Sequence, residues 1–276
     1  MATLEENYDF WNNKYNWTRY QGNQWSAQWG GPENQWNWCI YPRIYQHLPA
    51  QTILEIGPGY GRWTSFLRKH CKNLVLVDIS EKCIEVCREK LGQDNVSYHV
   101  TNGRSLDFLE PNSIDFAFSF ESLIHTEIDD LSAYLQDLSK VLKNQGHAFL
   151  HHSNLGCYRQ YFERSDKLPK GLSQFLRERG FLDFDEWRAP TVTHKNFEDA
   201  ALENGFSVIS QELVPWGGRR FTDCFTTLTL GSSERENQIV ENPLFVKRAK
   251  EIRSFSRLYG NGASWLSSAG PNRTSS

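Results

Sequence analysis

The side chains best suited to proton transfer follow two apolar segments of the chain. They are Glu121, His125, Glu127, His151 and His152. Imidazole titrates close to neutral pH, so a histidine can take a proton from a nucleophile while a neighbouring carboxylate orients the ring. We expect His125 to be the general base, with His152 or His151 as the second choice. Glu127 or Glu121 is expected to orient the imidazole.

Other interpretations of these histidines stay open. Side chains alternate along a strand, so His151 and His152 point to opposite faces and at most one of them reaches a substrate directly. Each histidine taken alone can equally be structural. A divalent ion is the remaining alternative, with ligands drawn from His125, His151, His152, Asp129 and Asp130. The spacing matches no established ligand pattern, so we expect no metal.

A glycine-rich turn follows the first expected strand, which ends at Glu55 and Ile56. Its glycines are Gly57, Gly59 and Gly61. Glycine lets the backbone approach a ligand closely, and the helix that follows adds free amides. Asp78 ends the next strand, where its carboxylate can accept both hydroxyls of a ribose. The G-x-G-x-G spacing differs from the G-x-G-x-x-G of dinucleotide-binding proteins, which makes a pyrophosphate a less suitable ligand.

On these residues the chain resembles the class I S-adenosylmethionine-dependent methyltransferases. The family's first motif is an acidic residue, one spacer and G-x-G-x-G, and residues 55–61 match it in full. The acidic residue at the end of the second strand matches Asp78. Asn102 and Gly103 match the pair that follows the third strand, and residues 112–115 resemble the start of the fourth. The resemblance covers roughly residues 50–230 and implies S-adenosylmethionine as the cofactor.

The resemblance also implies which residues bind this cofactor. They are Glu55, Gly57, Gly59, Gly61, Asp78, Ile79, Asn102, Gly103 and Glu121. The glycines would admit the methionine part, Asp78 would bind the ribose and Ile79 would pack on the adenine. Asn102 and Gly103 would contact the adenine edge, and Glu121 would lie near the methionyl group.

The elements expected around these residues alternate between strand and helix. Strands are expected at 52–56, 74–78, 96–100, 113–120, 146–151, 206–214 and 221–230, and helices at 62–70, 81–91, 129–142 and 195–204. This alternation is typical of an α/β fold with a doubly wound, mostly parallel seven-stranded sheet. The link at 215–218 is too short for a helical crossover, so we expect an antiparallel last strand.

We expect three parts in the chain. They are an aromatic helical cap or lid at 1–48, a cofactor-binding domain at 49–232 that contains a helical insertion at 154–191, and a C-terminal part at 233–276 with a helix at about 234–259 and a flexible tail from 264. The insertion follows the fifth strand, where the resembled family often builds acceptor specificity.

Six of the ten tryptophans lie within residues 1–47. This segment either packs as a cap on the core or covers the pocket as a lid. Aromatic faces attract cations and exclude water, and both properties suit a sulfonium cofactor. In the second case we expect Trp25, Trp29 or Trp36 near the sulfonium, and we count Trp29 among the cofactor-binding residues.

Composition narrows the classes of partner. The net charge of −3 shows no basic excess, which argues against a nucleic-acid substrate. We expect no membrane span because no run of 18 apolar residues occurs. The first residues do not form a signal peptide, and the six cysteines are scattered. We therefore expect a cytoplasmic protein with a small-molecule substrate, and a homodimer is one expected form.

The leading hypothesis is transfer of a methyl group to a hydroxyl of a small molecule, of the sugar or natural-product type, with a histidine general base. N-methylation or carboxyl methylation of a small molecule or peptide is the alternative within enzymes. A non-catalytic protein that binds S-adenosylmethionine is a second class, and a dehydrogenase is a third. The acceptor itself is not encoded in any motif of the sequence.

Overall fold

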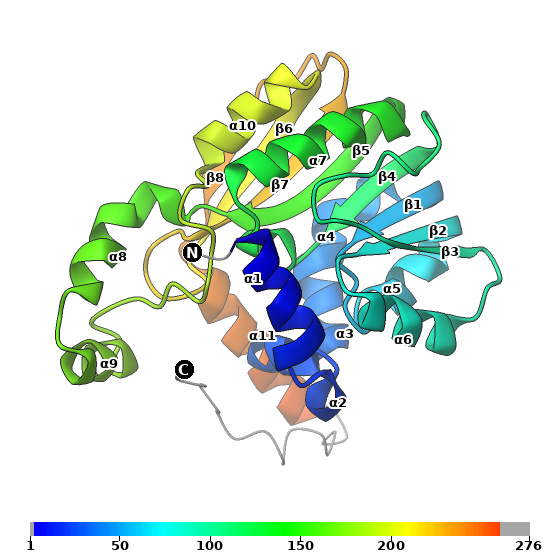
Figure 1. Cartoon of the computed structure of the whole chain (residues 1–276). Helices are drawn as coiled ribbons and strands as arrows, with labels where there is room; N and C mark the ends of the chain where they lie inside the picture. Colours follow the sequence, from blue (N-terminus) through cyan, green and yellow to red (C-terminus); the bar gives the residue numbers. More distant parts are fainter. Residues whose placement is uncertain (1–2, 260–276) are drawn as a thin grey trace.

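A single mixed sheet forms the centre of the molecule in the computed structural model, which describes residues 3–259 (Figure 1). Its eight strands run in the order β3-β2-β1-β4-β5-β7-β6-β8. Their bounds are β1 Ala50–Ile56, β2 Cys71–Asp78, β3 Val96–Val100, β4 Ile114–Ser119, β5 Leu142–Ser153, β6 Phe206–Val214, β7 Asp223–Leu230 and β8 Gln238–Glu241. The first five strands are parallel, and β7 lies antiparallel between β5 and β6. The expected α/β fold is confirmed, and the antiparallel strand expected at 221–230 is β7.

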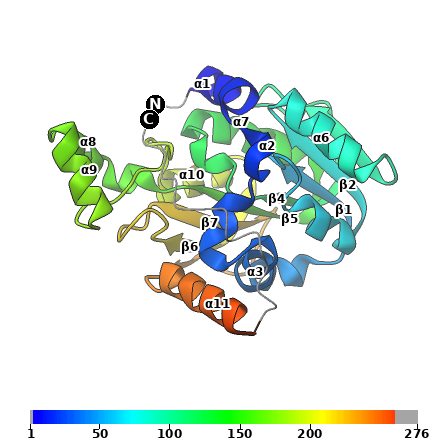
Figure 2. The same ribbon diagram turned by 90° about the horizontal axis from the view of Figure 1, so that it is seen from below.

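Helices cover both faces of this sheet. Their bounds are α1 Leu4–Asp9, α2 Trp17–Tyr20, α3 Pro32–Gln35, α4 Tyr41–Ile44, α5 Thr64–Leu67, α6 Glu81–Leu91, α7 Ile128–Val141, α8 Arg159–Asp166, α9 Lys170–Glu178, α10 His194–Glu203 and α11 Phe245–Tyr259. The apolar stripes of α7 and α10 pack together on one face. On the other face, α11 packs with buried residues of the N-terminal segment (Figure 2). No helix within residues 3–259 is both long and apolar enough to cross a membrane.

The strand count is eight rather than the expected seven, because β8 falls inside the segment 234–259 that we expected to be one helix. β8 adds to the sheet edge parallel to β6, with Gln238 beside Ser210. All four of its residues are exposed, and its two apolar residues are adjacent rather than alternating. The sequence of β8 therefore has no alternating pattern that would mark it as a strand. The helix of this part is α11, and the tail expected from 264 lies outside the described residues.

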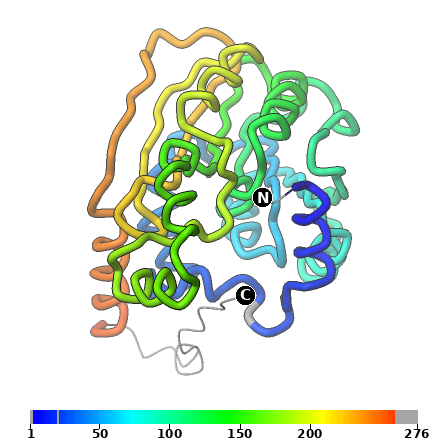
Figure 3. The backbone as a smooth tube through the Cα atoms, turned by 60° about the vertical axis from the view of Figure 1, so that its left-hand side comes forward, coloured from blue at the N-terminus to red at the C-terminus, as the bar shows by residue number. Residues whose placement is uncertain are grey.

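The N-terminal segment and the insertion lie on the same side of the molecule (Figure 3). Short helical pieces make up the N-terminal segment, and besides α1 to α4 they include Phe10–Lys14, Asn23–Trp29, Trp36–Ile40 and Tyr45–His47. Helices α8 and α9 project away from the sheet in both ribbon views (Figures 1 and 2). The two segments meet where the ring of Phe10 packs edge-on against Trp187 at 4.4 Å.

Candidate functional site

A glycine turn at the carboxyl end of β1 forms the floor of the main pocket. Gly57, Gly59 and Gly61 have φ of +74°, +56° and +81°, a region that residues with a Cβ rarely adopt. A Cβ at Gly57 would lie 1.9 Å from the hydroxyl of Ser122. The sequence GPGYG therefore folds into a turn that brings bare backbone against the pocket.

Asp78 at the end of β2 is buried, and each of its carboxylate oxygens accepts one backbone hydrogen bond. Ser80 donates to Oδ1 over 2.8 Å, and Gly59 donates to Oδ2 over 3.0 Å. Burial is the largest influence and raises the pKa of Asp78 to about 6. Both oxygens keep a second lone pair, and the residue lines the pocket beside Ile79 and Gly103.

Glu55 lies below the glycine turn and is almost fully buried. Neither carboxylate oxygen has a hydrogen bond of good geometry; the nearby Thr64 hydroxyl lowers the pKa of Glu55, but burial outweighs it and raises that pKa to about 8. The residue is not among those that line the pocket. It therefore reaches a cation in the pocket only through its charge or through a bridging water.

Aromatic side chains of the N-terminal segment cover the pocket. Trp11, Trp17 and Trp25 all line it. The indole of Trp17 stacks on Tyr60 at 4.9 Å and approaches Gly59 so closely that a Cβ there would lie 2.7 Å from it. These three side chains line the pocket and are called the lid below.

Trp29, which we expected near the sulfonium, lies elsewhere. It is buried against Phe245 of α11, with ring centroids 5.4 Å apart, and it does not line the pocket. Trp36 also lies outside the pocket, because it stacks on Phe66. Both tryptophans belong to the core beneath the lid, and Trp25 is the one of the three that lines the pocket.

Glu121 lies directly after β4 in a left-handed conformation, with φ of +60°. Gln35 donates a hydrogen bond to its Oε1 over 2.9 Å, and Arg62 forms a buried ion pair with Oε2. The guanidinium of Arg62 in turn lies over the ring of Trp63 at 4.4 Å. Glu121 therefore joins α3 to Arg62, the residue after the glycine turn, and lines the pocket with its charge paired.

His125 lines the same pocket from the short turn Leu123–His125 that follows β4. Its Nδ1 lies 2.9 Å from the carbonyl oxygen of Trp187. A carbonyl only accepts, so Nδ1 carries the proton and Nε2 keeps its lone pair. Burial lowers the pKa of His125 to about 4, which keeps the ring neutral at pH 7.

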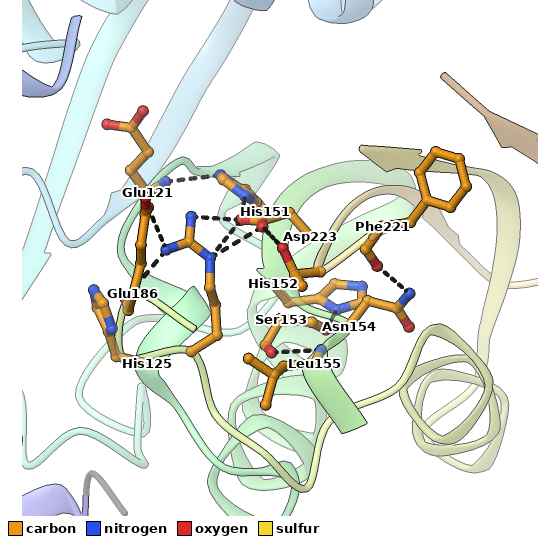
Figure 4. A network of polar contacts seen from close by, with 12 residues as sticks. Glu121, His125, His151, His152, Ser153, Asn154, Leu155, Glu186, Phe221 and Asp223 are labelled. Carbon is orange, nitrogen blue, oxygen red and sulfur yellow. Dashed lines mark hydrogen bonds and ion pairs between the residues drawn. The ribbon is translucent and has the colours of Figure 1, made fainter. Parts of the chain in front are cut away.

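The other two candidate histidines are buried and fully engaged. The backbone N–H of Glu121 donates to Nδ1 of His151 over 3.2 Å, and Nε2 of His151 lies 2.9 Å from Oδ1 of Asp223. His152 stacks on Phe197 of α10 at 3.8 Å. Figure 4 shows the ring of His152 apart from the pair formed by His151 and Asp223.

The ring of His152 therefore faces away from the pocket, as the alternation along β5 requires for one of the two histidines. Its Nε2 lies 2.8 Å from the hydroxyl of Thr226. A proton taken from a substrate in the pocket cannot reach it directly. Of the three histidines, only His125 lines the pocket.

Two further expected contacts are replaced by others. Glu127 accepts a hydrogen bond from the hydroxyl of Thr191, so it does not orient the His125 ring. The Trp187 carbonyl orients that ring instead.

Asn102 accepts backbone hydrogen bonds from Arg104 and Ser105 with its own Oδ1. It shapes the turn after β3 and leaves Gly103 to line the pocket. Among the described residues, no cluster of His, Cys, Asp or Glu has the geometry of a metal site.

Sequence reasoning missed several residues of this site. They are Arg62, Ser122, Tyr134, Trp187, Arg188 and Asp223. Arg62 directly follows the glycine motif, and that position is the one local signal available. Trp187 acts through its backbone carbonyl, which no side-chain pattern reveals. Asp223 comes from the antiparallel β7 and meets the site only through tertiary structure.

Comparison with known proteins gives related folds and sequences. The family model described as "Methyltransferase domain" matches residues 53–146. A phosphoethanolamine N-methyltransferase of Triticum aestivum is 31% identical over 124 residues, which are 43% of this chain and 24% of that protein. A methyltransferase of Aspergillus fumigatus is 26% identical over 39% of this chain and 34% of its own length. The matched part is thus about a quarter to a third of these relatives.

Solved structures share the fold. An S-adenosylmethionine-dependent methyltransferase from Mesorhizobium loti superposes with a TM-score of 0.52 at 17% identity, over 68% of this chain and 96% of that one. The N-methyltransferase NodS from Bradyrhizobium japonicum superposes with a TM-score of 0.50 at 14% identity, over 70% and 94%. At this identity the likeness concerns the fold alone.

Proposed function

We propose a function from the premise that this chain carries a class I S-adenosylmethionine-dependent methyltransferase domain, whose cofactor is S-adenosylmethionine. The enzyme transfers a methyl group to a hydroxyl of a small molecule, and His125 is its general base. The observation that carries the proposal is the tautomer of His125. Its Nδ1 donates to the Trp187 carbonyl, so its Nε2 lone pair is available at a ring that lines the pocket.

The residues around the pocket fit this cofactor. The glycine turn leaves room that a Cβ would fill, and Asp78 has lone pairs suited to two ribose hydroxyls. Glu55 is a buried carboxyl group without a hydrogen bond of good geometry, and the ammonium of a methionyl group would favour its charged form. When bound, S-adenosylmethionine supplies an electrophilic methyl group on a sulfonium.

His125 takes part in the transfer as the proton acceptor. Its Nε2 would take the proton of the acceptor hydroxyl, so that this oxygen can receive the electrophilic methyl group that the bound cofactor would supply. An imidazole with a pKa of about 4 is a weak base, but the hydroxyl becomes strongly acidic as its oxygen bonds to carbon. The hydrogen bond to Trp187 stabilises the imidazolium that forms, because Nδ1–H then donates to the carbonyl more strongly.

The aromatic lid contributes by excluding water. Trp11, Trp17 and Trp25 place ring faces at the pocket, and such faces attract a cation without offering a nucleophile. Water kept out of the pocket cannot compete with the acceptor for the methyl group.

N-methylation of a small amine is the second candidate, favoured by the relatives named phosphoethanolamine N-methyltransferase. A neutral amine carries its own lone pair and needs no base to attack the methyl carbon. The two candidates therefore differ in how strongly turnover depends on His125.

The test begins with calorimetric titration of S-adenosylhomocysteine, with NAD as the control ligand. We expect micromolar binding of the first and none of the second. Paired hydroxyl and amine acceptors on matched scaffolds are then screened with the wild type, His125→Ala and His147→Ala. His147 lies on β5 outside the pocket and serves as the matched control.

His125→Ala should lower kcat for a hydroxyl acceptor roughly 10²- to 10⁴-fold, the usual contribution of a general base, while cofactor affinity changes little. His147→Ala should leave both quantities unchanged. Full activity of His125→Ala on an amine would support N-methylation instead. Failure to bind S-adenosylhomocysteine would remove the catalytic claim and leave the fold alone.

A further inference from the structure

A buried ion pair connects Arg188, which follows the turn at Glu186 and Trp187, with Asp223, the first residue of β7. The guanidinium of Arg188 contacts both carboxylate oxygens of Asp223, with Nε at 3.0 Å from each and Nη2 at 2.9 Å from Oδ1. Arg188 is 5% exposed and Asp223 is fully buried. Neither residue lines the pocket, so the pair acts on the site only through the residues that it holds.

On one side the pair holds Glu121 through His151. Because the backbone N–H of Glu121 donates to Nδ1 of His151, that nitrogen carries no proton, and Nε2–H donates to Asp223. Figure 4 shows this chain from Glu121 through the His151 ring to Asp223. The Asp223 carboxylate thereby fixes one tautomer of His151 and keeps Glu121 at its φ of +60°.

On the other side the pair holds the carbonyl that orients His125. Glu186 and Trp187 both have left-handed backbone conformations, with φ of +45° and +63°. Nη1 of Arg188 donates to the carbonyl of Glu186 over 3.1 Å and pairs with its carboxylate over 3.0 Å. Arg188 thus anchors the turn whose next carbonyl, that of Trp187, accepts from Nδ1 of His125.

Such an arrangement is costly as a purely structural device. A buried ion pair gives little net stability relative to apolar residues of the same size. Left-handed conformations in residues other than glycine are unfavourable and persist only where the surroundings impose them. Here the ion pair contacts Glu186 directly and Glu121 through His151, and Trp187 follows Glu186 in the chain. All three of these residues have left-handed conformations.

We propose that Arg188, Asp223 and His151 are positioning residues, which hold the His125 imidazole and the Glu121 backbone in one fixed relation. The inference rests on the proposed role of His125. It links the proposed base with Glu121, which also lines the pocket and pairs with Arg62, the residue after the glycine turn.

The network also decides how the His125 ring responds to protonation. The charged and titratable groups that face it are Arg188, Asp223 and His151. Burial of the ring is the main cause of its low pKa. If the turn at Glu186 and Trp187 loosens, the ring becomes more exposed, which raises the pKa of His125, while the weaker hydrogen bond to the Trp187 carbonyl lowers it. Because burial is the larger of these two influences, the net change is a rise toward the ordinary value.

The test uses the full chain with the double substitution Arg188→Met and Asp223→Asn, which leaves no unpaired buried charge. The matched control is Arg43→Met with Glu212→Gln, a part-buried ion pair with contacts at 2.6 Å that touches no pocket residue. The His125 ring is titrated by NMR, with its signals identified by their loss in His125→Ala. Binding of S-adenosylhomocysteine is measured beside it.

We expect the double variant to bind S-adenosylhomocysteine within about 5-fold of the wild type, to raise the pKa of His125 by at least one unit and to lower kcat at least 10-fold. The control should change none of these. A folded double variant with an unchanged pKa of His125 would overturn the proposal. If the double variant does not fold, Arg188→Lys keeps the charge and removes the two-pronged contact, and the same upward change must appear.

The NMR titration needs no acceptor, so it separates this inference from the proposed function. A raised pKa of His125 with unchanged turnover would support the positioning network and overturn the role of His125 as base. An unchanged pKa of His125, in an enzyme whose activity depends on His125, would overturn the positioning network and support the role of His125 as base.

Discussion

At the scale of single residues, Glu55 opposes stability in the absence of a ligand. Its folded pKa of about 8 lies above the ordinary 4.5, so stability present below pH 4.5 is lost as the pH rises through 8. Glu55→Gln removes this effect. We expect the variant to be more stable at pH 8 by about 1–3 kcal/mol, measured by thermal unfolding without ligand.

The same substitution should weaken cofactor binding, because it removes the charge that offsets the methionyl ammonium. We expect the dissociation constant of S-adenosylhomocysteine to increase roughly 10-fold, about 1.4 kcal/mol. A variant that gains stability without losing affinity would show that Glu55 does not sense the bound cofactor.

The sequence predicts the placement of residues whose position follows from chain order. It does not predict the placement of residues that depends on tertiary packing. The glycine turn and Asp78 follow their strands directly, and chain order alone places them at the carboxyl edge of the sheet. Trp29 and Trp36 carry no local mark that separates a core tryptophan from one in the lid. Their placement depends on Phe245 of α11 and on Phe66, far along the chain.

At the scale of elements, the lid depends on Trp17, whose indole donates to the Trp11 carbonyl over 2.9 Å and covers Gly59. Trp17→Ala opens the pocket above the glycine turn. We expect S-adenosylhomocysteine to dissociate roughly 10-fold faster, measured by stopped-flow fluorescence, since changes in affinity usually appear in the dissociation rate. Trp38→Ala, at a tryptophan that is 62% exposed, is the matched control.

A lower unfolding temperature of Trp17→Ala with an unchanged dissociation rate would mean that the indole only packs. Release that is equally fast in the Trp38 variant would place the effect outside the lid.

Elements with their own apolar pattern were predicted well. The parallel strands are apolar runs, and α7 has a clear apolar stripe, so local sequence is enough to identify them. β8 is different, because its residues are exposed and it exists through pairing with β6. A strand that forms only through pairing with its neighbour leaves little trace in its own sequence, so residues 234–259 predict a helix throughout.

At the scale of the whole molecule, histidines that are partly or fully buried govern the response to acid. Burial lowers the pKa of His47 and His125 to about 4 and that of His152 to about 3. The unfolded chain takes up protons near pH 6.5, while the folded chain keeps these rings neutral. The unfolded state therefore binds more protons, and stability is lost as the pH falls from about 6.5 toward 4.

We expect the unfolding temperature to fall as the pH drops from 6.5 to 4.5, and to fall more gently as the pH rises from 6.5 toward 8, where ionisation of Glu55 costs stability. His152→Gln, whose amide can bond to Thr226, should flatten the fall toward acid pH, because about 1–3 kcal/mol of the pH dependence belongs to this one ring. Calorimetry at a series of pH values compares the two curves. Parallel curves would mean that His152 also takes up its proton in the folded state, and the acid response would then have to come from the other buried groups.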